Sequence, residues 1–201
     1  MVTFKKCTHY PVSNFFLIFS PNAMNTTTFI AVLMFTMLSG ATSMLAQQKD
    51  SLSQYQTKTL SVLGKVKTPI TLTVSDFAAM KSITVRNVNI VSHSGERKEL
   101  IVSAKGVLLK DILDKAGIVF EERRDFNRLV IIAKASDGFR AVWTWHEIFN
   151  TDIGTAVLVI YEKNGQTLGS REGNFMMLSS KDYKTGPRHI RWLKEIEVLK
   201  L

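Results

Sequence analysis

The single cysteine of this chain, Cys7, limits the possible folds and sites more than any other residue. One cysteine cannot form an intrachain disulfide, so the fold has to be stabilised by its packed core. Cys7 also lies near the N-terminus, in a segment that we expect to be removed. The mature domain would then have no thiolate for a metal site and no cysteine nucleophile.

Residues 1–46 are typical of a leader that directs export. An apolar run from Phe29 to Leu38 is followed by small residues. About 10 apolar residues are too few for a helix that spans a bilayer, which needs about 20, but they suit a secretory signal. We predict cleavage after Ala46, which places the protein in the periplasm or outside the cell, without a stable membrane span. A start at Met24 instead of Met1 and an uncleaved N-terminal anchor are the alternatives.

The remaining sequence predicts one domain with affinity for anions. Residues 47–59 are polar and lack periodicity, as in a flexible linker, and residues 60–201 are enough for a substantial core. Because the leader contains two basic and no acidic residues, the mature chain has a formal net charge of +7. This balance favours an anionic cofactor, a phosphorylated small molecule or lipid headgroups. We do not expect nucleic acid as a partner, because the basic residues are dispersed and export is expected.

The first half of the domain has the pattern of a β-rich fold. Alternating apolar residues predict strands at residues 60–66, 69–74, 83–90 and 99–103. Ser75 is expected to cap a short helix at residues 76–80, because its side chain can accept a hydrogen bond from the first turn. Gly106 should end the fourth strand. Apolar residues at helical spacing then predict a second helix at residues 107–116, which Gly117 stops.

The second half adds strands joined by turns of recognisable chemistry. Asp137-Gly138 and Asn164-Gly165 are turn signals, because these residue types accept positive φ. Trp143 and Trp145 flank Thr144 and are expected on one face of a strand. Further strands are predicted at residues 129–133, 139–143, 156–161, 175–178 and 190–199. Many strands with two short helices and no internal repeat indicate an α+β fold that is mainly β.

This order of segments resembles the oxidoreductase molybdopterin-binding domain, the fold of the sulfite oxidase family and of bacterial periplasmic methionine-sulfoxide reductases. The resemblance covers residues 60–199 and rests on an ordered set of segments rather than on one motif. These are PITLTVSDFAAM, GVLLKDILDKAGI, SDGFRAVWTWHEI, NGQTLGSREGNFMML and GPRHIRWLKEIEV. It implies a sulfite oxidase-type fold, a molybdopterin cofactor and a redox partner in the cell envelope.

A basic stretch near the C-terminus is the strongest candidate for a binding site. It contains Lys184, Arg188, His189, Arg191 and Lys194, around Gly186-Pro187. Guanidinium groups bind phosphate oxygens in pairs, and a glycine lets the backbone approach a ligand closely. By the resemblance, Arg188, His189 and Arg191 match the positions that hold the terminal phosphate of the pterin. The stretch could instead be a solvated edge that prevents sheet pairing.

The family's metal-binding cysteine has no counterpart in the matching segment. By the resemblance, it should fall just after the strand that ends near Ile90, where this chain has Val91-Ser92-His93. The oxygen of Ser92 is a poor replacement for a soft thiolate, and one imidazole, that of His93, does not define a metal site. His146 could contact a phosphate or be a structural residue. We therefore predict no metal ligands, and the catalytic residues stay unknown.

Two functions of different classes follow. The first is an exported molybdopterin-dependent oxidoreductase-like protein that binds the pterin phosphate through the basic C-terminal stretch. The second is a cofactor-free module on the same fold, which binds a ligand or a partner without redox activity. The missing cysteine favours the second mechanism, whereas the retained outline and the basic stretch favour membership of the family.

Overall fold

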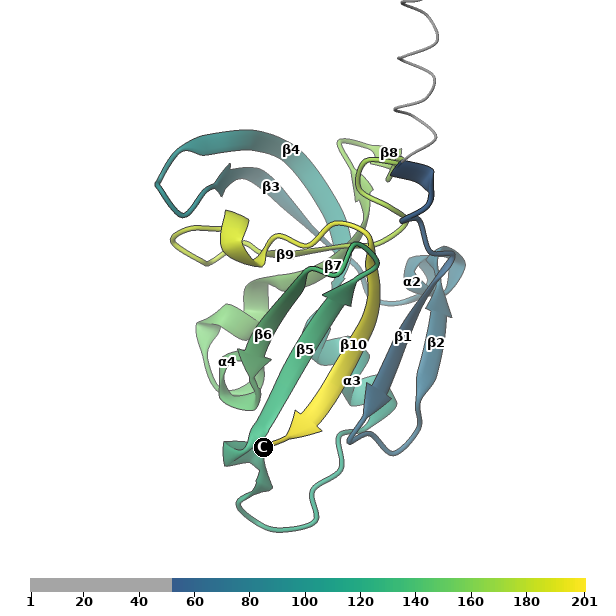
Figure 1. The fold of residues 1–201 in the computed structure, drawn as a ribbon, viewed down its shortest axis with the longest axis vertical. Helices are drawn as coiled ribbons and strands as arrows, with labels where there is room; N and C mark the ends of the chain where they lie inside the picture. Colours follow the sequence, from purple (N-terminus) through teal and green to yellow (C-terminus); the bar gives the residue numbers. More distant parts are fainter. Residues whose placement is uncertain (1–51) are drawn as a thin grey trace, which may run out of the picture. The chain divides into compact units, whose positions relative to one another are not determined.

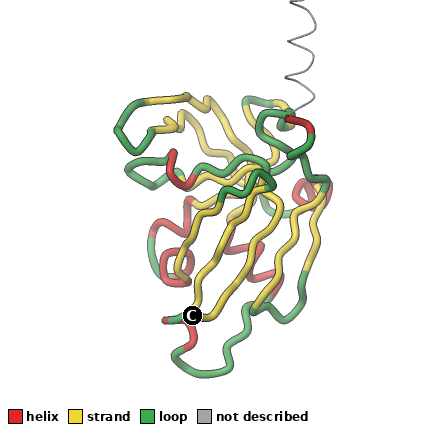
Figure 2. The backbone as a smooth tube through the Cα atoms, in the orientation of Figure 1, coloured by secondary structure: helices red, strands yellow, loops and turns green. Residues whose placement is uncertain are grey.

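The computed structural model describes residues 52–201, in which strands predominate (Figure 1; Figure 2). The predicted leader, its cleavage site and the first residues of the linker lie outside the described residues. Within residues 52–201, no helix is long and apolar enough to cross a membrane. The α+β fold with mainly β structure is confirmed, and each predicted strand overlaps a strand of the structure.

The first sheet combines the two ends of the described chain. Its strands, in order, are β2 (Ile70–Thr73), β1 (Thr59–Gly64), β10 (Leu193–Lys200), β5 (Leu129–Ala135) and β6 (Arg140–Thr144). β1 and β10 run parallel, and the other neighbours are antiparallel. Alternation along β10 buries Ile196 and Val198. Glu195 and Glu197 form ion pairs with Lys134 of β5, so this polar face stays outside the core.

The second sheet carries the hairpin that later forms one wall of a cleft. Its strands are β3 (Ile83–Val91), β4 (Arg97–Leu108), β7 (Val157–Lys163) and β8 (Gln166–Thr167), and β9 (Met176–Ser179) also pairs with β7. The prediction that Gly106 ends β4 is wrong, because the strand continues to Leu108. A Cβ atom on Gly106 would lie 2.4 Å from the carbonyl oxygen of Val159. Gly106 thus permits a close approach of β4 and β7.

The helices are short and are set by capping side chains. They are α2 (Val74–Ala79), α3 (Leu109–Ala116) and α4 (Trp145–Phe149), with short 3₁₀ turns η1 (Asp125–Asn127), η2 (Asp152–Ala156) and η3 (Gly186–Arg188). Thr73, not Ser75, caps α2, and its side chain and that of Asp76 form a reciprocal capping box. Gly117 ends α3 with a positive φ of 70°, as predicted.

The prediction that Trp143 and Trp145 share one strand face is wrong. Thr144 and Glu147 form a second capping box, so β6 ends and α4 begins at this point. Trp143 is fully buried on β6, whereas Trp145 opens α4 and stacks on Phe149, with ring centroids 5.2 Å apart. The two tryptophans therefore belong to different elements.

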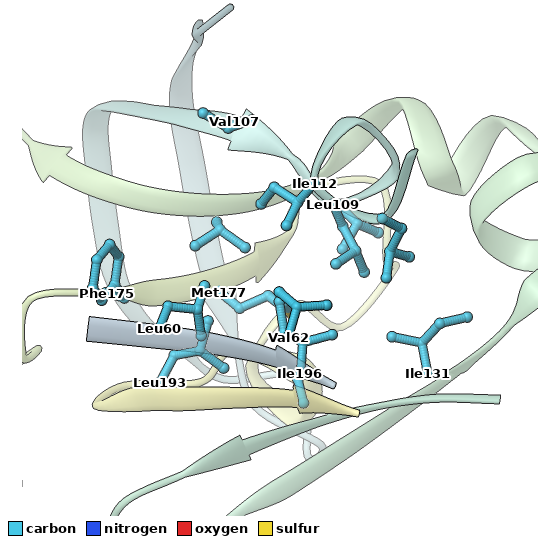
Figure 3. Close-up of a cluster of buried hydrophobic side chains, with 14 of the residues drawn as sticks. Leu60, Val62, Val107, Leu109, Ile112, Ile131, Phe175, Met177, Leu193 and Ile196 are labelled. Atoms are coloured by element: carbon cyan, nitrogen blue, oxygen red, sulfur yellow. The ribbon is translucent and has the colours of Figure 1, made fainter. Parts of the chain in front are cut away.

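The main core lies between the two sheets and is closed by α3. Figure 3 shows Leu60 of β1 and Ile196 of β10 in the same apolar layer as Ile112 of α3 and Met177 of β9. Successive residues of β7 point to opposite faces of the second sheet. Leu158 therefore belongs to a second buried cluster under the β3–β4 hairpin. This second cluster anchors the hairpin to the body of the domain.

Candidate binding cleft

A cleft of about 750 Å³ lies between the β3–β4 turn and the segment that precedes β10. Its lining residues are Ile90, Ser92, His93, Lys98, Glu99, Phe139, Gly186, Pro187, His189 and Arg191. In Figure 1, the hairpin of β3 and β4 and the yellow segment around η3 lie at the same end of the domain. The volume is in the range of sites for small molecules.

Three contacts hold the two walls together. The hydroxyl of Thr185 donates to the carbonyl of Asn89 over 2.6 Å and accepts from the N–H of Val91 over 2.9 Å. Lys184 donates to the carbonyl of His93. A Cβ atom on Gly186 would lie 2.7 Å from the carbonyl oxygen of Val91, so only glycine permits this packing. The predicted site segments, which are far apart in the sequence, thus form one cleft.

Ser92 belongs to a tight turn that is closed by its own hydrogen bonds. Its N–H donates to the carbonyl of Glu96 over 2.8 Å, and its carbonyl accepts from Gly95. Its hydroxyl accepts from the N–H of Glu96 over 3.1 Å and lies 2.9 Å from the hydroxyl of Ser94. The side chain at the position expected for the family's thiolate is therefore already engaged within the turn.

Arg191 is the cleft residue best suited to bind an anion. Its side chain is exposed, its guanidinium carbon lies 5.1 Å from the ring centroid of Trp192, and it has no ion-pair partner among residues 52–201. By contrast, Lys98 is paired with Glu96, and Glu99 is paired with Lys163. A guanidinium that is not neutralised by a carboxylate can bind phosphate oxygens in pairs.

His189 lines the cleft as a neutral imidazole. Its Nε2 atom lies 2.9 Å from the sulfur of the fully buried Met176. Burial lowers the pKa of His189 to about 4, so the ring carries no charge at neutral pH. Because a thioether can only accept, the proton is expected on Nε2, and Nδ1 is left as an acceptor. His189 can thus accept a hydrogen bond from a ligand but adds no positive charge.

The lowered pKa of His189 predicts a loss of stability in acid. The unfolded chain binds a proton here below about pH 6.5, whereas the folded chain does so only below about pH 4. The unfolded state holds more protons between these values, so stability falls as the pH falls. The expected loss from His189 is about 2 kcal/mol between pH 7 and pH 5. Urea unfolding at both pH values measures it, and an equally steep loss in His189→Gln would contradict this assignment.

Arg188 lies outside the set of cleft-lining residues. Its guanidinium donates to both carboxylate oxygens of Asp182, over 2.8 and 2.6 Å, and to Glu147 over 2.8 Å. It also lies over the buried ring of Trp143, 5.0 Å from the centroid. These carboxylates raise its pKa. Arg188 therefore joins the segment before η3 to α4 and β6, and two carboxylates already balance the charge of its guanidinium.

His146 also lies away from the cleft. It belongs to α4, and its Nε2 atom lies 2.9 Å from the side-chain oxygen of Asn127. Its ring meets the edge of Phe126 with centroids 5.5 Å apart. These contacts favour the structural interpretation of His146.

Six of the ten cleft-lining residues were not among the predicted site residues. Ile90, Gly186 and Pro187 lie beside predicted residues in the sequence, whereas Phe139, Lys98 and Glu99 do not. Phe139 is 42% exposed and follows the Asp137-Gly138 turn, so an aromatic residue directly after a turn was an available signal. Lys98 is the extra residue of a bulge between β3 and β4, and Glu99 follows it. No local pattern in the sequence predicts this bulge, so Lys98 and Glu99 could not be assigned to the cleft from the sequence.

The family model of the oxidoreductase molybdopterin binding domain matches residues 47–201. The chain belongs to this family. The crystal structure of the sulfane dehydrogenase SoxCD from Paracoccus pantotrophus is similar, with a TM-score of 0.50 and 13% identity. The similarity covers 72% of this chain but only 38% of that chain, and at this identity it shows the fold alone. No curated protein matches the chain. The resemblance seen in the sequence is thus confirmed.

The cleft fits one part of the family's cofactor and not the other. Its size, Arg191 and the exposed ring of Phe139 suit a flat heterocycle that carries a phosphate. For the metal of the cofactor, the described residues of the cleft offer no suitable donors. Residues 52–201 contain no cysteine, and they contain no group of three or more His, Cys, Asp or Glu residues that could hold a metal. The described residues therefore do not fit ligation of molybdenum by a protein thiolate.

Proposed function

We propose that this chain is an exported oxidoreductase-like protein whose cleft binds a phosphorylated pterin. The observation that carries the proposal is the position of Arg191, a guanidinium in a cleft of about 750 Å³ that has no ion-pair partner within residues 52–201. Membership of the molybdopterin-binding family supports the class of ligand. A redox partner in the cell envelope is part of the same proposal, because oxidoreductases of this family need a source or acceptor of electrons.

The chemistry of the lining suits the three parts of such a ligand. The phosphate would bind Arg191, and the backbone at Gly186 could approach it closely because no side chain intervenes. The ring of Phe139 offers an apolar face to a flat heterocycle. Nδ1 of His189 would accept a hydrogen bond from an N–H group, which a pterin ring has and a phosphate group does not. His189 would then orient the ring rather than hold the phosphate.

Replacing Arg191 by glutamine is expected to weaken binding of neopterin monophosphate about 10- to 100-fold. The loss of one charge-assisted contact of about 1.5–3 kcal/mol gives this factor. The intrinsic fluorescence of the pterin measures binding. Neopterin without phosphate should bind both proteins alike, because it lacks the group that Arg191 recognises.

Lys194→Gln provides the matched control for this measurement. It removes the same charge from an exposed side chain that does not line the cleft. Binding should then stay within about twofold of the parent, since a distant surface charge is screened by salt. If both variants weakened binding equally, the loss in Arg191→Gln would reflect the overall charge of the protein and not a contact between Arg191 and the phosphate. An unchanged affinity in Arg191→Gln would contradict the proposed site.

Export is the part of the proposal that rests on the sequence alone. The apolar run at residues 29–38 and the small residues after it support cleavage after Ala46. Mass spectrometry of the protein from an envelope fraction should find a chain that begins at Gln47. A chain that begins at Met1 or Met24 in the cytosol would contradict export.

A further inference from the structure

We infer that the cleft binds a pterin phosphate that carries no metal, because the described residues offer no suitable ligand to one. This inference rests on the proposed function and adds to it the metal state of the ligand. The family is named for molybdopterin, yet three possible metal donors of this cleft, Ser92, Glu99 and His189, already have partners within the protein.

Ser92 cannot act as a substitute for the missing thiolate. Its hydroxyl accepts from the N–H of Glu96 and lies 2.9 Å from the hydroxyl of Ser94. To bind a metal as an alkoxide, it would have to lose its proton and its contact with the hydroxyl of Ser94. A neutral hydroxyl is also a hard and weak donor in comparison with sulfur.

The carboxylate of the cleft is also engaged. Glu99 lies 3.0 Å from the ammonium of Lys163, which also binds Glu172. Lys163 is largely buried, with 18% of its side chain exposed, and these carboxylates raise its pKa. Removing Glu99 from this pair to bind a metal would leave a largely buried ammonium with only one partner, which is costly. The carboxylate of Glu99 therefore neutralises Lys163 and is not available to bind a metal.

The two imidazoles of the cleft do not form a pair of metal ligands. Nε2 of His189 lies against the sulfur of Met176, which leaves one nitrogen. His93 is exposed on the turn, where Lys184 holds its carbonyl. Lys98 and Glu99 of the cleft are each paired, so the remaining charge is that of Arg191, which disfavours a cation there. The cleft thus has the electrostatics of an anion site.

Two measurements on the full chain test this inference. The parent is purified from a host that makes molybdopterin, and its molybdenum is measured by mass spectrometry for metals. Neopterin monophosphate, which carries no metal, is then titrated into the protein. We expect far less than one molybdenum per chain, saturable binding of neopterin monophosphate, and no change in its affinity when molybdate is added.

The outcomes separate this inference from the proposed function. Stoichiometric molybdenum in the parent would overturn the inference and leave the proposed pterin site standing. Failure of neopterin monophosphate to bind better than neopterin would overturn the proposed function, and the inference with it. Binding that requires molybdate would also overturn the inference, because the metal would then belong to the ligand that the protein recognises.

Ser92→Cys, with Ser94→Cys as its control, tests where the metal ligand has been lost. Both variants add one thiol to the same turn, but only Ser92 stands at the expected position. Molybdenum uptake by Ser92→Cys alone would support the inference, because the metal-free state of the parent would then follow from the missing thiolate at this position. Uptake by Ser94→Cys, or by neither variant, would overturn the assignment of the lost ligand to Ser92.

Discussion

Replacing Phe77 by alanine is expected to lower the free energy of unfolding by about 3–5 kcal/mol. Phe77 is fully buried on α2, and its ring centroid lies 5.0 Å from that of Phe175 and 6.2 Å from that of Tyr161. These partners belong to the segment before β9 and to β7. The ring thus attaches α2 to the second sheet, and its removal leaves a cavity with walls that other strands hold in place. Urea unfolding monitored by tryptophan fluorescence measures the loss.

Phe139→Ala is the control that separates core packing from a general effect of removing an aromatic ring. Phe139 is 42% exposed and lines the cleft. Its replacement is expected to change stability by no more than about 0.5 kcal/mol. A similar loss in the two variants would contradict the view that the contacts of Phe77 stabilise the fold. Phe139→Ala should instead weaken binding of a pterin.

The parts of the fold that follow from local chemistry could be predicted from the sequence. Gly138 and Gly165 have positive φ values of 94° and 77°, and they stand in the turns that Asp-Gly and Asn-Gly predict. Gly117 ends α3 in the same way. In each case the preference of one or two residues decides the backbone, so no distant neighbour has to be known.

The errors arise where a distant neighbour decides. A glycine at the end of an apolar run is equally compatible with the end of a strand and with a close approach of two strands. Only the carbonyl of Val159, which comes much later in the chain, makes Gly106 an internal strand residue. The beginning of α4 is a different case, since Thr144 and Glu147 have the spacing of a capping box and were available as a signal.

In the candidate site, too, some residues could be identified from the sequence, whereas the roles of others depend on distant neighbours. The resemblance to the family brought together Ser92, His93, His189 and Arg191, and the structure places all four in one cleft. Arg188 and Arg191 could not be distinguished in the sequence, because both are basic residues of one short stretch. Their difference depends on Asp182 and Glu147, and Glu147 comes from another element.

Replacing Arg188 by glutamine is expected to lower the free energy of unfolding by about 3 kcal/mol, because it leaves two partly buried carboxylates without their cation. Asp182 is 10% exposed and Glu147 is 30% exposed, so water can compensate only part of the loss. Asp182 would then lose both of its bonds from the guanidinium, although it keeps the hydroxyl of Ser179. The segment before η3 should loosen from α4, and urea unfolding at pH 7 measures the change.

Arg191→Gln is the matched variant for this prediction, because it makes the same substitution three residues away. Arg191 has no ion-pair partner among residues 52–201, so its loss should change stability by no more than about 0.5 kcal/mol. The two variants should therefore show that Arg188 stabilises the fold and that Arg191 binds the ligand. If Arg188→Gln instead left stability unchanged and weakened binding of neopterin monophosphate as Arg191→Gln does, the guanidinium of Arg188 would serve the phosphate and not the fold. That result would support the assignment of Arg188 made from the family resemblance.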